Sequence, residues 1–67
     1  MGTLPRLSRT LRRARRQRGL SQQSLAERAG LTREYLARLE TGQHNPSVAT
    51  IQKLARALRV PVTELLS

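Results

Sequence analysis

The stretch that decides the fold is SQQSLAERAGLTREYLARLE, at residues 21–40. Ser21 and Thr32 each precede a short run with apolar residues at helical spacing, and a hydroxyl at such a place accepts a hydrogen bond from the first turn of a helix. Gly30 lies between the two runs, where it tolerates the positive φ that ends the first helix. The stretch therefore predicts two short helices joined by a tight turn that contains glycine.

The sequence on either side continues this pattern. Upstream, Leu7, Leu11 and Ala14 recur at helical spacing, and Gly19 ends that helix. Downstream, Ser47 is positioned to cap a further helix. The apolar side of that helix is expected to consist of Val48, Ile51, Leu54, Ala55 and Leu58. We predict five helices, over about residues 6–18, 22–29, 33–40, 48–58 and 62–66.

The chain has 67 residues, which is enough for one domain. Cysteine, Phe and Trp are absent and Tyr35 is the one aromatic residue, so the core must be aliphatic and no disulfide holds it together. The inward residues of the two central helices are expected to be Leu25, Ala26, Ala29, Leu36 and Leu39. The fold class is therefore all-α, with a compact domain over residues 6–67 that follows a flexible segment of residues 1–5.

The charge is strongly positive. Thirteen Lys and Arg against four Asp and Glu give a formal net charge of +9. Such a surface attracts polyanions, which means nucleic acid first and an anionic membrane second. Part of the arginine cluster in residues 6–18 is expected to lie near phosphate. No apolar run reaches the roughly 20 residues of a membrane span, and a protein of the cytoplasm, associated with the nucleoid, is expected.

With these motifs in place, the sequence resembles the Cro and phage-repressor type of helix-turn-helix domain, also called the xenobiotic-response-element type. The matching run is Arg15-x-x-Arg18-Gly19-Leu20-Ser21-Gln22, then Leu25-Ala26, Ala29-Gly30-Leu31-Thr32, Leu36-x-x-Leu39-Glu40, Asn45-Pro46-Ser47 and Ile51-x-x-Leu54-Ala55. The resemblance implies a five-helix, lambda-repressor-like DNA-binding domain whose helix 33–40 lies in the major groove.

The same resemblance implies roles for individual residues. Contacts to base edges are expected from Arg33, Glu34, Tyr35 and Arg38. Contacts to DNA phosphate are expected from Arg15, Gln22, Thr32, Gln43, His44, Asn45 and Ser47. Arg15 and Glu40 are also expected to form a partly buried ion pair. Several phage proteins carry Gln where this chain has Arg33 and Glu34, so their operators cannot be carried over.

The predicted function is a transcriptional regulator, and specifically a repressor, that binds an operator in double-stranded DNA as a homodimer. The dimer interface is expected at Arg59, Val60, Pro61, Val62 and Leu66. An antitoxin or other protein-interaction module that also regulates its own operon is the alternative, and sequence-independent binding of RNA or an anionic membrane through arginine is the third. No catalytic constellation, metal site or cofactor is expected, because the chain has no Asp or Cys and one His. No small-molecule ligand is expected either, because the sequence shows no sensor domain.

Overall fold

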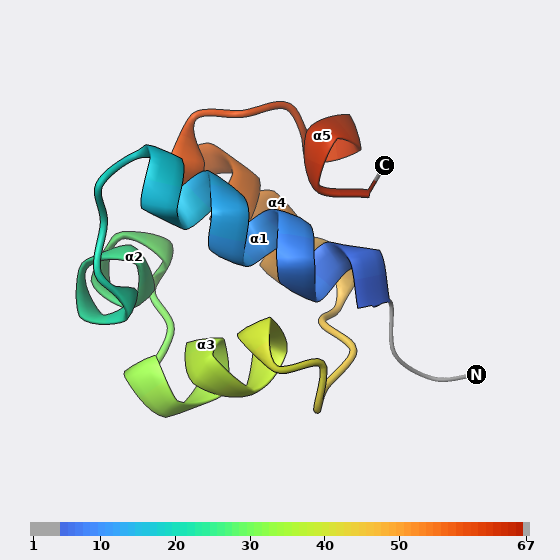
Figure 1. Ribbon diagram of the computed structural model, residues 1–67, viewed down its shortest axis with the longest axis horizontal. Coiled ribbons are helices and arrows are strands. Elements are labelled where there is room, and N and C mark those ends of the chain that lie inside the picture. The colour runs from blue at the N-terminus through green and yellow to red at the C-terminus, as the bar shows by residue number, and fades with distance from the viewer. Residues whose placement is uncertain (1–4, 67) are drawn as a thin grey trace.

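The computed structural model describes residues 5–66 and is all-α, as predicted. In chain order its helices are α1 (Pro5–Gln17), α2 (Gln22–Ala29), α3 (Arg33–Glu40), α4 (Val48–Leu58) and α5 (Val62–Leu66) (Figure 1). Figure 1 shows α1 crossing the middle of the molecule, with α2 and α3 on one side of it and α5 on the other. None of the helices in this part of the chain is long and apolar enough to cross a membrane.

The first helix starts and ends slightly earlier than the sequence predicted. Pro5, which was assigned to the flexible N-terminal segment, is the first residue of α1. Proline suits that place because its φ is already helical and its missing N–H would have had no partner in the first turn. The remainder of the predicted flexible segment, residues 1–4, lies outside the described residues.

Side-chain caps fix the start of the three middle helices. The Oγ atoms of Ser21 and Ser47 accept hydrogen bonds from the backbone N–H groups of Ser24 and Thr50, at 3.0 and 3.1 Å. Thr32 Oγ1 accepts from the N–H of Tyr35 at 3.1 Å. Each bond satisfies one of the free donors of a first turn, so the helices begin where the sequence predicted.

Two helices end in a left-handed residue, but only one of these residues is a glycine. Gly30 ends α2 with φ 71°, and the N–H of the next residue, Leu31, reaches back to the Ala26 carbonyl at 2.8 Å. Arg59 ends α4 in the same left-handed conformation, with φ 59°, and is not a glycine. A left-handed backbone costs an L-residue with a Cβ about 1–2 kcal/mol, so the α4 end is held by its surroundings rather than by local preference.

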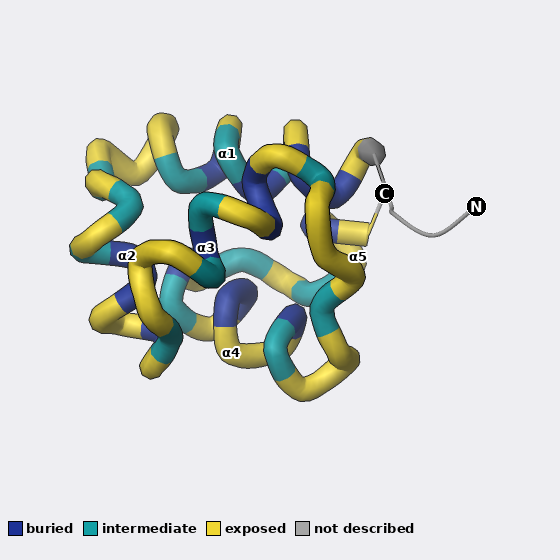
Figure 2. The backbone as a smooth tube through the Cα atoms, turned by 90° about the horizontal axis from the view of Figure 1, so that it is seen from below, coloured by how far each residue is buried: buried dark blue, intermediate teal, exposed yellow. Residues whose placement is uncertain are grey.

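Each helix contributes apolar side chains to one core, which Figure 2 shows as the dark segments on the inner side of each helix. The buried apolar residues are Leu7, Leu11, Ala14, Leu25, Ala26, Ala29, Leu36, Leu39, Ile51, Leu54, Ala55, Leu58 and Leu65. The helices that pack together are α1 with α3 and α5, α2 with α3 and α4, and α4 with α5. Burial of these aliphatic groups is the main source of stability in a chain without disulfides.

Val48 is the exception to the predicted core. The sequence placed it on the inner side of α4, but its side chain is 69% exposed. Val48 is the first residue of the helix, so its side chain lies beyond the end of the core that Ile51 begins one turn later. Leu66 is also exposed, at 52%, whereas its neighbour Leu65 is completely buried.

Candidate nucleic-acid interface

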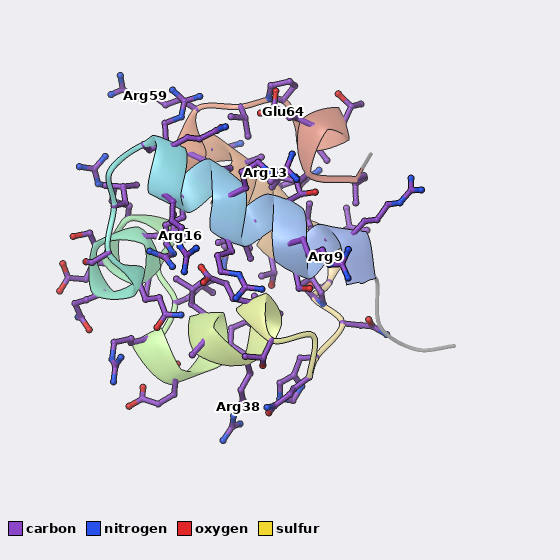
Figure 3. All side chains as sticks on the ribbon, viewed as in Figure 1. Arg9, Arg13, Arg16, Arg38, Arg59 and Glu64 are labelled. Atoms are coloured by element: carbon purple, nitrogen blue, oxygen red, sulfur yellow. The ribbon has the colours of Figure 1, made fainter. Side chains whose placement is uncertain are left out.

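The outer surface of α3 is set by its own amphipathic pattern. Leu36 and Leu39 are buried against the core, so the residues on the opposite side are turned to solvent. The exposed side chains at this surface are Thr32, Arg33, Glu34 and Arg38. Arg38 extends from the side of α3 that faces away from α1 (Figure 3). Exposed polar and charged side chains on one side of a helix are what contact with base edges in a major groove requires.

Tyr35 and His44 bring the loop after α3 against the helix. Their rings lie with centroids 5.9 Å apart at an angle of 46°, and Tyr35 is half-buried while His44 is exposed. The loop is also tied to the helix by the backbone N–H of Gln43, which donates to the Arg38 carbonyl at 2.9 Å. The two regions to which the sequence assigned base and phosphate contacts are therefore neighbours.

The loop itself presents polar groups to solvent. Gln43, His44 and Asn45 are exposed, and so is Ser47 at the start of α4. The Ser47 hydroxyl accepts from the Thr50 N–H and donates to Thr50 Oγ1 at 3.0 Å. Both bonds lie within the first turn of α4, so they hold the Ser47 side chain at the start of that helix.

Arg15 and Glu40 form a two-point ion pair between α1 and the end of α3. Arg15 Nε lies 2.7 Å from Glu40 Oε2, and Arg15 Nη2 lies 3.1 Å from Glu40 Oε1. The third contact of the guanidinium is from Nη1 to the Leu20 carbonyl, at 2.8 Å. The Arg15 side chain is 11% exposed and that of Glu40 is 2% exposed. Arg15 is thus turned into the protein, and little of it is available to a phosphate.

Gln22 joins the same pair, which the sequence did not predict. Its Nε2 donates to Glu40 Oε1 at 3.2 Å, so one carboxylate connects residues of α1, α2 and α3. The orientation of the amide follows from the carboxylate, which only accepts hydrogen bonds when ionised. Gln22 is half-buried, and it keeps its second amide proton and its backbone N–H at the start of α2.

The segment expected to form a dimer lies elsewhere. Arg59, Pro61 and Leu66 are exposed, whereas Val60 and Val62 are half-buried and pack against the core. In Figure 3, Arg59 and Arg38 extend from opposite sides of the molecule. Within residues 5–66, no group of three or more His, Asp or Glu side chains is placed to hold a metal ion.

Known proteins share both the sequence and the arrangement. A family described as helix-turn-helix matches residues 11–65. The uncharacterized HTH-type transcriptional regulator y4dJ of Sinorhizobium fredii is 44% identical over 55 residues, covering 82% of this chain and 71% of that protein. The immunity repressor protein of Bacillus phage phi105 is 43% identical over 51 residues, covering 76% of this chain but 35% of the repressor.

A solved structure extends the likeness to three dimensions. The restriction-modification controller protein C.AhdI from Aeromonas hydrophila superimposes with a TM-score of 0.88 at 43% identity, covering 90% of this chain and 91% of that one. The predicted fold and the predicted family are both confirmed. The chain belongs to the Cro and phage-repressor type of the helix-turn-helix family, which consists of DNA-binding transcriptional regulators and not of enzymes.

Proposed function

We propose that this protein is a repressor that recognises a particular operator in double-stranded DNA, with α3 in the major groove. The observation that carries the proposal is the two-sided pattern of α3, in which Leu36 and Leu39 are buried while Arg33, Glu34 and Arg38 are exposed. Arg33 would donate two hydrogen bonds to the O6 and N7 atoms of a guanine, and Glu34 would accept from the N4 amine of a cytosine. Tyr35 and Arg38 would extend these contacts along the groove.

Phosphate contacts would fix the orientation of α3. Gln22 and Thr32 stand at the starts of α2 and α3, where free backbone N–H groups favour an anion. Gln43, His44, Asn45 and Ser47 would form a second contact beyond the other end of α3. Arg15 would act mainly through Glu40 and Gln22, by holding α2 and α3 in place, because three of its N–H groups already have protein acceptors.

A homodimer would give the protein a longer operator. One helix contacts only a few base pairs, and two copies on half-sites about one helical turn apart would add their specificities. Leu66, 52% exposed beside the segment from Arg59 to Val62, is the apolar group that supports an interface there. A repressor of this kind would act in the cytoplasm, at the nucleoid.

Selection of bound sequences from a pool of random duplexes tests the function directly. A two-fold symmetric consensus, in which each half-site contains a G·C pair that Arg33→Ala makes degenerate, is the expected result. The substitution should lower affinity by about 1–3 kcal/mol, or roughly 5- to 140-fold. Recovery of duplexes without any consensus would contradict sequence-specific recognition. Copurification of an unrelated protein in place of self-association would favour the antitoxin alternative.

A further inference from the structure

Most of the positive charge of this protein lies away from α3. The outer surface of α3 carries Arg33 and Arg38, and the carboxylate of Glu34 between them offsets one of these charges. The formal net charge of the whole chain is +9. Contact between α3 and a major groove therefore leaves the larger part of the excess positive charge away from the DNA.

The largest group of unused cations lies on α1, which has no acidic residue. Leu7, Leu11 and Ala14 are buried, so the opposite side of the helix is turned to solvent. The α1 arginine face consists of Arg6, Arg9, Arg12, Arg13 and Arg16, of which Arg12 is half-buried and the others are exposed. Arg9, Arg12, Arg13 and Arg16 surround a part of this face that no acidic residue lines, whereas Glu64 of α5 lies opposite Arg6 and Arg13.

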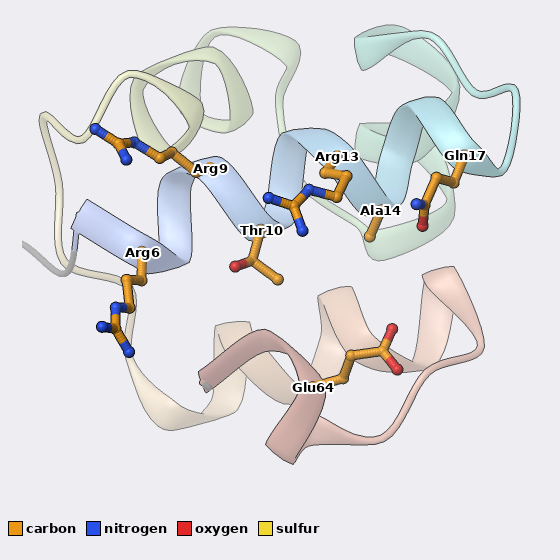
Figure 4. Close-up of a pocket in the computed structure, with 7 residues that line it drawn as sticks. All are labelled: Arg6, Arg9, Thr10, Arg13, Ala14, Gln17 and Glu64. Atoms are coloured by element: carbon orange, nitrogen blue, oxygen red, sulfur yellow. The ribbon is translucent and has the colours of Figure 1, made fainter.

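The five arginines surround two adjoining open hollows. One, of about 470 Å³, lies between α1 and α5, with Arg6, Thr10 and Arg13 along one side and Glu64 on the other (Figure 4). The second is lined by Arg9, Arg12, Arg13, Arg16 and Gln17, without an acidic residue. An anion is favoured most strongly at this second hollow, because only cations and a neutral amide surround it.

This face is separate from the proposed recognition surface. Figure 3 shows Arg9, Arg13 and Arg16 along the length of α1, whereas Arg38 extends from the far side of α3. Arg15, which does lie on the α3 side of α1, is occupied by Glu40. A duplex against α3 would leave the α1 arginine face accessible to a second molecule.

The composition of the face favours phosphate over a protein partner. Protein interfaces have an apolar or aromatic centre, but the exposed large apolar residues of the described chain are Val48 and Leu66, and neither lies on α1. Arg9, Arg13 and Arg16 follow one another at helical spacing, about 6 Å and about 4.5 Å apart along the axis. Like charges so close repel each other, and a row of phosphates relieves the repulsion through bidentate hydrogen bonds and counterion release.

We propose that the α1 arginine face binds the phosphate backbone of a second DNA duplex, without regard to its sequence, so that one protein molecule bridges two duplexes. The bridging rests on the proposed role of α3, whereas the binding of phosphate by α1 does not. The protein would thereby hold an operator next to any neighbouring stretch of DNA.

Two charge-matched variants test this proposal in the full chain. Arg9→Gln/Arg13→Gln/Arg16→Gln removes three exposed cations from the α1 arginine face. Arg28→Gln/Lys53→Gln/Arg56→Gln removes three exposed cations from the region between α2 and α4. Circular dichroism verifies that both variants fold. If the α1 triple variant does not fold, the single substitution Arg13→Gln is used in its place. Affinity for a random-sequence duplex is then measured by fluorescence anisotropy over a range of salt.

The α1 variant should bind the random duplex more weakly than the control variant, and its slope of log K against log salt should fall by about 2–3 units. In a second assay, a duplex from the site selection is fixed to beads and the capture of a labelled random duplex is measured. The α1 variant should occupy the beads but capture little. The variant Arg33→Gln/Arg38→Gln should lose the preference for the selected duplex, and its affinity for the random duplex should fall less than that of the α1 variant, which separates failure of α3 from failure of α1.

Three outcomes would overturn the proposal. Equal losses in the α1 and control variants would mean that net charge alone controls binding. Capture by the α1 variant at the level of the unsubstituted protein would mean that another surface holds the second duplex. Competition by polyglutamate as strong as by duplex, at equal charge concentration, would assign the α1 arginine face to an acidic protein segment.

Discussion

The guanidinium of Arg15 donates hydrogen bonds to both carboxylate oxygens of Glu40, at 2.7 and 3.1 Å, and so connects the last residue of α3 to the last turn of α1. Gln22 donates to the same carboxylate from the first residue of α2. Three helices thus meet at one charged group inside a small aliphatic domain. The geometry of the turn between α2 and α3 depends on this group as well as on apolar packing.

Glu40→Ala should destabilise the fold by about 3 kcal/mol, because it leaves the mostly buried guanidinium of Arg15 without its partner. The free energy of unfolding of a chain of this length is roughly 3–10 kcal/mol in total, so the variant should be close to unfolding at room temperature. Urea titration followed by circular dichroism measures the change. Glu40→Gln keeps the shape and an acceptor and should lose less, and a loss below about 1 kcal/mol in Glu40→Ala would contradict a structural role for the pair.

The sequence predicted the parts of this fold that local chemistry controls. Ser21, Thr32 and Ser47 cap helices because a hydroxyl there satisfies a first-turn N–H, and that signal needs no tertiary information. Val48 was assigned to the core because the period of α4 continues to its first residue, but periodicity does not indicate where a neighbouring helix ends. The left-handed Arg59 was missed for a similar reason, since no residue preference marks it.

In the candidate site, too, the sequence predicted what local pattern controls and missed what depends on the packing of the helices. The sequence distinguishes the outer residues of α3 from the buried Leu36 and Leu39, because they differ in polarity. The bond between Gln22 and Glu40 has no such signal, since it joins residues of two helices whose relative placement only the folded chain defines. The sequence of the helix does not predict which base each outer residue contacts, because that also depends on how the DNA is placed against the helix.

The two left-handed helix ends should respond oppositely to substitution. A Cβ at Gly30 would meet no atom within 4 Å, so Gly30→Ala should cost about 1 kcal/mol through the backbone alone. Arg59→Gly removes the same strain and retains the 3.4 Å bond from Arg18 Nη2, whose acceptor is the Arg59 carbonyl. Thermal unfolding should show a lower Tm for the first variant only. An equal fall in both would show that backbone strain does not control these ends.

Glu34→Gln should increase affinity for random duplexes and weaken the discrimination among sequences. A carboxylate in the groove is repelled by phosphate whichever bases are present, and it rejects bases that cannot donate to it. Glu27→Gln on α2 is the matched control, with the same change of charge at an exposed residue outside the proposed interface. Parallel binding assays with the selected and the random duplex should show a larger effect for Glu34→Gln than for Glu27→Gln. Equal effects of the two substitutions would contradict a place for Glu34 in the interface.

Gln22→Ala should weaken binding to every duplex alike, because a phosphate contact carries no sequence information. It also removes a donor from the buried carboxylate of Glu40, so a modest loss of stability of about 1 kcal/mol should accompany it. Affinities for the selected and the random duplex measure the first effect, and urea titration measures the second. A change in the preferred sequence would instead place Gln22 at a base edge.

Leu66→Glu should abolish self-association without unfolding the monomer, since the side chain is already 52% exposed. Val48→Glu makes the same change at the other exposed large apolar residue and should leave association intact. Sedimentation equilibrium of both variants, free and with duplex, distinguishes the two cases. A protein that is monomeric before any substitution, alone and on DNA, would remove the dimer from the proposed function.

The ring of Tyr35 lies on the proposed recognition helix, against His44, and the chain contains no Trp and no second Tyr. All of the protein's near-ultraviolet emission therefore originates at one side chain beside the surface where bases would arrive. Stacking against a base or displacement of His44 would change that emission. The molecule thus carries an intrinsic optical reporter of its own occupancy, and complex formation can be followed without attaching a dye.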